Sequence, residues 1–514
     1  MTGRDARPTE AVQSIVESAV ARASVPGKLW FQDSDSVAGT EYSSVSSPRS
    51  TMTGKMPVIL KTFTDRRHMR ILLVQIPTSH LGAGERVYPL GLSRLSRLIP
   101  DRFEKQALDM NLQSDPWPAL KQALLDFNPD VVALSMRNMD PLAGHQTSYL
   151  SSLKTSARMV RLLVPAARIL AGGPAFSLFG KRLMHECPEI DCGLIGEGEG
   201  AFPQLLGSSS LESVPGLIWR SSYGLDDNPR GDHINMDALP EMDVDLFRPA
   251  DYTRGNKYVA AVGIEGKRGC DLHCAYCVYP SLGGRKMRLR SPVKIVDEME
   301  CLNKEHGLSL FHFTDSVVNR PADHFEAVCR EILRRKLPID WTGFFREDTL
   351  TEQLTDLAVR AGLCAVYFSA DALTEHGLKV LNKRMSKKDV LRAARITAAI
   401  GVLTMCHFLI NLPGETRAHV AEARDMLHSI LDVHHPVGNL GAVIFNNVRL
   451  YPDALLTSKL LNAGLLDPRV DLLYPVYHNP IGSAHVLHEL EALCHVAGVF
   501  SRLGLTTRME DYKS

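Results

Sequence analysis

Three cysteines with short spacing stand near the middle of the chain, at Cys270, Cys274 and Cys277. The segment 267–277 reads KRGCDLHCAYC and gives the pattern CxxxCxxC. Three thiolates on one loop can bind three irons of a 4Fe-4S cube and leave the fourth iron to a small chelating molecule. The alternatives are three unrelated thiols, or a zinc site completed by His273 or a distant residue, because closed zinc sites use four ligands. The loop position and the preceding Arg-Gly pair favour the open cluster.

The residues around these cysteines resemble the radical S-adenosylmethionine (SAM) superfamily, whose cluster pattern has an aromatic residue before the last cysteine, as Tyr276 is here. The resemblance implies that SAM binds the open iron through its amino and carboxylate groups. It also implies that an electron from the cluster cleaves SAM to a 5′-deoxyadenosyl radical, and that an external flavodoxin- or ferredoxin-like donor supplies the electron. The protein's own share is then to orient the cofactors and exclude water.

Further residues match positions that relatives use around SAM. Asp315 ends the second predicted barrel strand, where relatives often carry an acidic residue, and Arg346 matches a frequent arginine that can pair with the SAM carboxylate through a charge-assisted fork. Asp371 stands where relatives carry Glu, in a segment that resembles FGxES, and 411–416 (NLPGET) resembles GLPGET. The resemblance therefore implies SAM contacts for Tyr276, Asp315, Arg346 and Asp371. Strand-end capping or turn chemistry is the alternative for each.

Glycine-rich turns follow two predicted strands nearer the N-terminus. Residues 171–174 read AGGP and residues 196–199 read GEGE, so backbone without side chains lines one edge of a sheet and admits a flat ligand. Open α/β sheets bind ligands at the carboxyl ends of their strands. The arrangement resembles the cobalamin-binding domain found in front of many radical SAM enzymes. It implies cobalamin contacts for Ser135, Gly172, Gly173, Gly196, Glu197 and Gly198.

The sequence DxHxxG, from which other cobalamin domains supply a histidine to cobalt, is absent. His80 lies in the corresponding loop, but its neighbours lack both the Asp and the correctly placed Gly, so a solvated loop histidine is the favoured interpretation. Many relatives lack this lower ligand. A sheet that only packs against the second domain is the alternative for the whole unit.

The elements that position these residues follow from apolar runs of strand length that alternate with amphipathic stretches of helical length, a pattern typical of parallel sheets. The predicted fold class is α/β: a doubly wound, flavodoxin- or Rossmann-like cobalamin-binding domain, a partial (β/α)6 radical SAM barrel and a mostly helical tail. Chemistry in such a barrel lies at the carboxyl ends of the strands. The predicted boundaries are a disordered leader at 1–66, the cobalamin-binding domain at 67–206, a linker at 207–250, the barrel at 251–450 and the tail at 451–514.

The predicted elements can be compared directly with a structure. In the first domain, strands are expected at 71–76, 131–135, 168–171 and 192–195, and helices at 90–99, 117–127, 148–163 and 201–206. The linker is expected to carry one hairpin. In the barrel, strands are expected at 308–313, 339–344, 364–369, 404–410 and 440–446, and helices at 293–305, 324–335, 354–361, 387–399 and 419–431.

Composition bounds the class of protein. A chain of 514 residues is long enough for two or three domains. Its 58 Lys and Arg balance its 58 Asp and Glu, so no net basic charge attracts nucleic acid or anionic lipid. No apolar run approaches the roughly 18 residues that a bilayer crossing needs. The N-terminus lacks the apolar core of a secretory signal, which favours a cytoplasmic protein whose ten cysteines need not form disulfides.

Together the two resemblances imply a cobalamin-dependent radical SAM methyltransferase. It would transfer a methyl group from SAM, via methylcobalamin, to an unactivated carbon or to phosphorus of a small metabolite in natural-product biosynthesis. The first alternative is an isomerase, cyclase or lyase that uses the same cofactors without net methyl transfer. The second is a non-catalytic cobalamin or iron–sulfur sensor.

Overall fold

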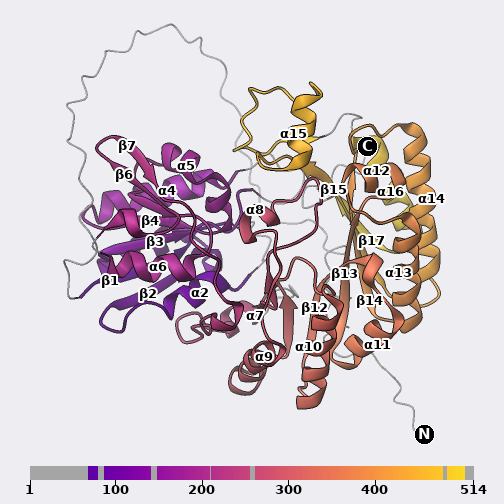
Figure 1. Cartoon of the computed structure of the whole chain (residues 1–514), viewed down its shortest axis with the longest axis horizontal. Helices are drawn as coiled ribbons and strands as arrows, with labels where there is room; N and C mark the ends of the chain where they lie inside the picture. The colour runs from indigo at the N-terminus through magenta and orange to yellow at the C-terminus, as the bar shows by residue number, and fades with distance from the viewer. Residues whose placement is uncertain are drawn as a thin grey trace, which may run out of the picture.

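The computed structural model describes residues 68–78, 86–140, 148–208, 210–254, 261–478 and 483–503. The predicted disordered leader at 1–66 lies outside these residues. Two α/β units lie side by side, the N-terminal one drawn in indigo to magenta and the other mostly in orange (Figure 1). Across the described ranges, no helix combines the length and apolarity that a membrane crossing requires.

The N-terminal unit is built on a seven-stranded sheet with the order β2-β1-β3-β4-β5-β6-β7. Strands β1 to β5 are parallel, and β6 and β7 add an antiparallel hairpin beyond β5. The order 2-1-3-4-5 is flavodoxin-like and places the switch point between β1 and β3. The strands are β1 (Arg70–Gln75), β2 (Glu104–Asp109), β3 (Val131–Ser135), β4 (Arg168–Gly172), β5 (Cys192–Leu194), β6 (Leu217–Ser221) and β7 (Gly224–Asp227).

Helices cover both faces of this sheet, which confirms the doubly wound fold. Alternate residues of β1 belong to separate cores, with Ile71 and Leu73 on one face and Leu72 and Val74 on the other. The helices of the first face are α2 (Leu90–Ser96) and α6 (Gly198–Gly207), and those of the second are α3 (Pro116–Phe127), α4 (Leu150–Leu163) and α5 (Pro174–Glu186).

The second unit contains six parallel strands that neighbour one another in chain order, from β8 through β11, β12, β13 and β14 to β15. This is the topology of the predicted partial (β/α)6 barrel. The C-terminal strand β17 pairs parallel with β15, and β16 pairs antiparallel with its end. The strands are β8 (Gly263–Ile264), β11 (Leu310–Phe313), β12 (Asp340–Phe345), β13 (Leu363–Asp371), β14 (Leu403–Ile410), β15 (Leu440–Arg449), β16 (Tyr477–His478) and β17 (Phe500–Leu503).

Helices alternate with these strands, and a two-stranded ladder of β9 (Lys267–Arg268) and β10 (Arg288–Leu289) follows β8. The helices are α7 (Pro249–Thr253), α8 (Tyr279–Gly283), α9 (Pro292–His306), α10 (Ala322–Arg335), α11 (Glu352–Arg360), α12 (Glu375–Val380), α13 (Lys387–Ile400), α14 (Arg417–His434), α15 (Leu455–Asn462) and α16 (Ser483–Val496).

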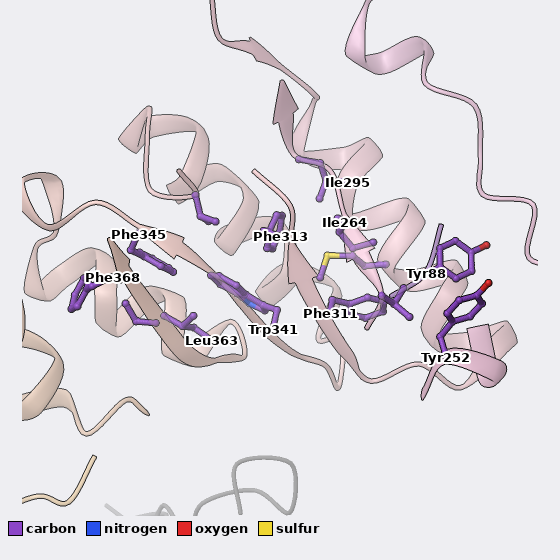
Figure 2. Packing of buried hydrophobic residues seen from close by; sticks show 14 of the residues in the cluster. Tyr88, Tyr252, Ile264, Ile295, Phe311, Phe313, Trp341, Phe345, Leu363 and Phe368 are labelled. Carbon is purple, nitrogen blue, oxygen red and sulfur yellow. The ribbon is translucent and has the colours of Figure 1, made fainter. Parts of the chain in front are cut away.

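One apolar core is continuous between the two units. Tyr88, which precedes α2, packs edge-on against Tyr252 of α7 with ring centroids 5.1 Å apart, and its N–H donates to the Ala261 carbonyl over 2.8 Å. Figure 2 shows this core from Tyr88 and Tyr252 to Trp341 and Phe368 in the barrel. The large shared core means that burial of apolar surface holds the two sheets together.

Two predicted boundaries differ from the observed elements. The hairpin expected inside the linker pairs with β5 and extends the first sheet to Asp227, past residue 206, because Leu217 and Ile218 are buried in its cores. The tail contains α15 and α16, as expected, but its β17 joins the barrel sheet.

Candidate functional site

The three cysteines lie on a loop that closes between β9 and β10. Gly269 leaves β9 with a φ of +83°, and a Cβ there would lie 2.2 Å from the Lys286 carbonyl oxygen. The Cys270 N–H donates to the Gly284 carbonyl over 3.0 Å, which closes the loop. The glycine before the first cysteine is therefore required by a close backbone approach.

The thiols are partly shielded from water. Cys270 is buried and Cys274 and Cys277 are partly buried. Burial raises the pKa of Cys274 and raises that of Cys277 to about 12, although a hydrogen bond from the Tyr279 backbone N–H to Cys277 opposes the rise. Within the described ranges, no three His, Cys, Asp or Glu side chains are arranged to hold a metal ion. An iron–sulfur cube does not need three side chains that converge on one metal ion, because each thiolate binds a different iron of the cube.

His273 was the candidate fourth ligand of a closed zinc site. It is exposed, and its Nδ1 lies 3.0 Å from the Arg285 guanidinium. Its carbonyl accepts a hydrogen bond from Asn382 over 2.7 Å. The donor set of the loop therefore consists of three thiols, which fits an iron–sulfur cube with one open iron better than a four-ligand zinc site.

Tyr276 and Asp371 meet beside Cys274. The Tyr276 hydroxyl donates to the Asp371 carboxylate, and Lys383 Nζ donates to the same oxygen over 2.6 Å. Asp371 ends β13 with a φ of +65°, a conformation that residues other than glycine adopt rarely and that is frequent at functional sites. Burial raises the pKa of Cys274, and the nearby charge of Lys383 opposes that rise. Lys383 therefore favours the thiolate that a cluster needs.

Arg346 follows β12 and is engaged within the protein. Its Nε lies 2.7 Å from the Asp348 carboxylate, and its Nη2 donates to the Lys383 carbonyl. The side chain of Asn319 accepts from the Arg346 N–H over 2.8 Å. Pairing of Arg346 with a SAM carboxylate thus remains a prediction.

Asp315 binds the segment that leads to the cysteines. Its carboxylate accepts from the backbone N–H groups of Gly266 and Lys267 over 2.7 and 3.0 Å. Lys267 Nζ lies 3.6 Å from the same carboxylate and donates to three backbone carbonyls between residues 317 and 320. Burial raises the pKa of Asp315 to about 6, and the charge of Lys267 opposes the rise. The structure therefore gives Asp315 a loop-positioning role, and its contact with SAM stays a prediction.

Ser135, Gly172 and Gly173 meet at the carboxyl edge of the first sheet. Ser135 lies opposite Gly172 in the β3–β4 pair, and the Met136 N–H donates to the Gly172 carbonyl over 2.9 Å. Gly173 has a φ of +102°, and a Cβ there would lie 2.6 Å from the Met136 carbonyl oxygen. This turn carries no side chain at Gly172 or Gly173, as a flat ligand at this edge requires.

The second glycine turn is tied to the first by one hydroxyl group. Ser177 Oγ donates to the Gly173 carbonyl and accepts from the Gly196 N–H, both over 3.0 Å. Gly196 has a φ of +88°. The two turns are therefore held at a fixed separation at the sheet edge.

Glu197 and Gly198, whose cobalamin contacts stay predictions, also contact other parts of the protein. The Glu197 carboxylate accepts from the Arg288 guanidinium of β10. A Cβ on Gly198 would lie 3.2 Å from Leu95 of α2, so this glycine serves the packing of α6 against α2. His80 lies outside the described residues.

The carboxyl edges of the two sheets face each other. Arg449, the last residue of β15, forms a buried ion pair of 3.0 Å with Asp140, which lies beyond the end of β3. Helix α5, which follows the first glycine turn, contacts α8, which follows the last cysteine of the loop. Arg230 joins these helices by donating to the carbonyls of Ser177 and Ser281. The glycine turns and the cysteine loop therefore lie on the two sides of one interface (Figure 1).

Sequence reasoning missed several residues of this region. Lys267 and Arg268 stand directly before the cysteine segment, so their proximity was a usable signal. Lys383 was not taken as a site residue, although it follows Asp371 by only 12 positions. Ser177 and Glu347 carry no pattern that sets them apart before the fold is known.

Comparison with known proteins assigns both units. Residues 81–206 match the family model of the B12 binding domain, and residues 264–427 match that of the radical SAM superfamily. An uncharacterized methyltransferase of Pyrococcus horikoshii, PH0819, is 25% identical over 76% of this chain and 84% of its own length. A cytidylyl-2-hydroxyethylphosphonate methyltransferase of Streptomyces wedmorensis is 23% identical over 91% of this chain and 95% of its own.

The fold also matches a solved structure. The radical SAM methyltransferase TsrM from Kitasatospora setae, determined with cobalamin and a 4Fe-4S cluster bound, superposes with a TM-score of 0.68 at 21% identity over 83% of this chain and 91% of its own. The cofactors that go with the two family models are a 4Fe-4S cluster, SAM and cobalamin, and the three-thiol loop and the glycine-lined sheet edge fit them. The chain is therefore a B12-binding radical SAM enzyme.

Proposed function

We propose that this enzyme is a methyltransferase that moves a methyl group from SAM to an unactivated carbon, or to phosphorus, of a small metabolite. The observation that carries the proposal is the convergence of the two carboxyl edges, joined by the Arg449–Asp140 pair and by the contact of α5 with α8. A methyl carrier at one edge and a radical source at the other then share one substrate space. The methyltransferase relatives over most of the chain support the same reaction.

The atoms balance for transfer to carbon. One substrate C–H, two SAM and two electrons from an external donor give one C–CH₃, one S-adenosylhomocysteine, one 5′-deoxyadenosine and one methionine. The substrate hydrogen goes to 5′-deoxyadenosine. Cobalamin supplies a methyl carrier, and the cluster supplies the electron that cleaves the second SAM.

The protein's own residues prepare this site. Lys383 and Arg346 place positive charge near Cys274 and so favour its thiolate. Tyr276 and Lys383 both donate to Asp371, which fixes the position of that carboxylate at the rim of the barrel. The Asp315–Lys267 pair fixes the strand that enters the cysteine loop.

The first test needs no acceptor molecule. Anaerobic chain loaded with iron, sulfide and hydroxocobalamin should hold about four irons, and Cys270→Ala, Cys274→Ala or Cys277→Ala should lose them. Reduced holoenzyme given SAM with a deuterated methyl group should release S-adenosylhomocysteine in step with methyl uptake by the protein-bound corrin.

Product analysis separates the other functions. Formation of 5′-deoxyadenosine without S-adenosylhomocysteine contradicts the methyltransferase and supports an isomerase, cyclase or lyase. Absence of both products from a fully loaded enzyme supports a sensor. S-adenosylhomocysteine alone supports methyl transfer without a radical, and the mass gained by the acceptor then identifies the substrate.

A further inference from the structure

Two arginines flank the cysteine loop, and each binds one glutamate of the GEGE segment. Arg268 and Arg288 stand opposite each other in the β9–β10 pair. Arg268 Nη2 donates to Glu199 over 2.6 Å, and Arg288 donates to both oxygens of Glu197, over 3.1 Å from its Nη1. The two arginines at the ends of the cysteine loop are therefore both paired with carboxylates of the N-terminal unit.

These contacts are largely shielded from solvent. The exposed fractions of the side chains are 8% for Glu199, 10% for Glu197, 14% for Arg288 and 17% for Arg268. Burial alone would raise the pKa of Glu197, but hydrogen bonds from Arg288 and from the Ile234 backbone N–H lower it overall. The Arg288–Glu197 pair is made through two nitrogen–oxygen contacts, which fix orientation as well as distance.

The contacts continue into the interior. Arg268 Nε lies 2.8 Å from Glu265, which pairs with Arg94 of α2 over 3.1 Å. Arg94 is completely buried and pairs with Glu298 over 3.0 Å. Charges therefore balance in the network, whose members are the arginines 94, 268, 288 and 290 and the glutamates 197, 199, 265 and 298.

We propose that Glu197 and Glu199 are positioning residues that clamp the base of the cysteine loop and so set the distance between the two cofactors. Gly196, at the cobalamin edge, immediately precedes Glu197, and Gly269, at the start of the cysteine loop, immediately follows Arg268. Each cofactor site is thus adjacent in sequence to one half of the clamp. The inference rests on the proposed function, because it assumes that both cofactors bind at these edges.

The clamp would couple radical formation at one cofactor to methyl transfer from the other. The radical must form where the methyl carrier can reach the substrate, and a displacement of about 1 Å is enough to slow a reaction by about 100-fold. A loosened clamp leaves each cofactor in its own unit but lets the spacing between them vary. Radical formation then continues while methyl transfer falls.

The test compares Glu197→Gln and Glu199→Gln with Glu186→Gln in the full-length holoenzyme. Glu186 pairs with Lys154 over 2.5 Å within the first unit and does not contact the loop, so it is the matched control. Both clamp variants should keep wild-type iron and cobalamin contents. The distance distribution between the reduced cluster and cob(II)alamin, measured by pulsed electron paramagnetic resonance, should broaden, and methyl product per 5′-deoxyadenosine should fall by about 100-fold.

A second readout does not need either cofactor. Hydrogen exchange in the chain without cofactors should accelerate across residues 269–287 in the clamp variants and stay at the wild-type rate in the control. Unchanged exchange together with an unchanged product ratio overturns the clamp. A wild-type chain that takes up neither cofactor contradicts the proposed function instead, and hydrogen exchange still decides the clamp.

If the substitutions only destabilise the fold, the result is different. In that case cofactor content and thermal stability fall together, and the product ratio per loaded enzyme stays constant. Arg288→Lys keeps the charge but loses the planar fork on Glu197, so the clamp requires it to behave like Glu197→Gln in the distance measurement. Wild-type behaviour of Arg288→Lys contradicts an orientational role.

Discussion

At the scale of single residues, Glu347 is a buried carboxyl group that the proposed reaction does not use. Its side chain is about 1% exposed, and neither oxygen has a hydrogen-bond partner among the described residues. Burial raises the pKa of Glu347 to about 7, and the charge of Lys383 opposes the rise. A buried acid without partners is stable only when it is protonated.

The expected effect of Glu347→Gln depends on pH. The folded pKa lies above the ordinary value of 4.5, so the wild-type protein loses about 3 kcal/mol of stability as pH rises from 4.5 to 7. The glutamine variant lacks this loss, and its thermal midpoint should exceed that of the wild type at pH 8 but not at pH 5. Glu241→Gln, at an exposed position, is the control. An equal change at both pH values argues against a neutral buried acid.

The roles of side chains could be predicted only in part from the sequence. The cysteine spacing is a local pattern, so Cys270, Cys274 and Cys277 were identifiable without a fold. Arg346 and Glu197 were assigned by position in a segment. Asp348, the carboxylate partner of Arg346, lies only two residues away, but Arg288, the partner of Glu197, comes from a distant part of the chain. Such long-range pairing depends on the packing of the two units, which a single sequence does not show.

At the scale of elements, the cysteine loop depends on one backbone conformation. Gly269→Ala would place a Cβ 2.2 Å from the Lys286 carbonyl at a φ of +83°, at a cost of about 1–3 kcal/mol or more. Iron content after reconstitution should fall well below that of the wild type, and the thermal midpoint of the chain should drop. Gly207→Ala, in α6 with open space around the added atom, should leave both unchanged. A fully loaded Gly269→Ala enzyme contradicts a strict need for glycine.

Most elements were predictable because their apolar periodicity is strong. All five later barrel strands were expected within three residues of their observed ends, since each is a buried run. Strand β2 was missed because it lies at the sheet edge and reads EKQALD, where exposed charged residues hide the alternation. Helix α5 was missed although Pro174, its first residue, is a common helix-start signal.

At the scale of the whole molecule, the sequence predicted two cofactor domains but not how they are joined. The neutral net charge gave no sign that four arginines and four glutamates are gathered at the interface. The continuous apolar core was also not visible, because residues such as Tyr88 and Tyr252 look like ordinary core residues of separate units. Tertiary packing creates both features.

This interface should loosen in acid. Burial raises the pKa of Glu265, but Arg268 and Arg94 lower it to about 2 overall, and the pKa of Glu197 is also lowered. Because the folded pKa lies below the ordinary value of 4.5, the ionised Glu265 contributes stability that is complete above pH 4.5 and is lost as pH falls toward 2, on the order of 3 kcal/mol. The radius of gyration of the chain from X-ray scattering should rise over this range.

The variant Glu265→Gln isolates this contribution from general acid unfolding. It removes the ionisable group but leaves the apolar core intact, so its stability should be lower than that of the wild type at pH 7, and the gap should close as pH falls. Added salt should shift the wild-type transition only slightly, since ions screen buried pairs much less than exposed ones. A gap between the two proteins that is independent of pH would show that the network holds the two sheets by shape and packing rather than by ionised carboxylates.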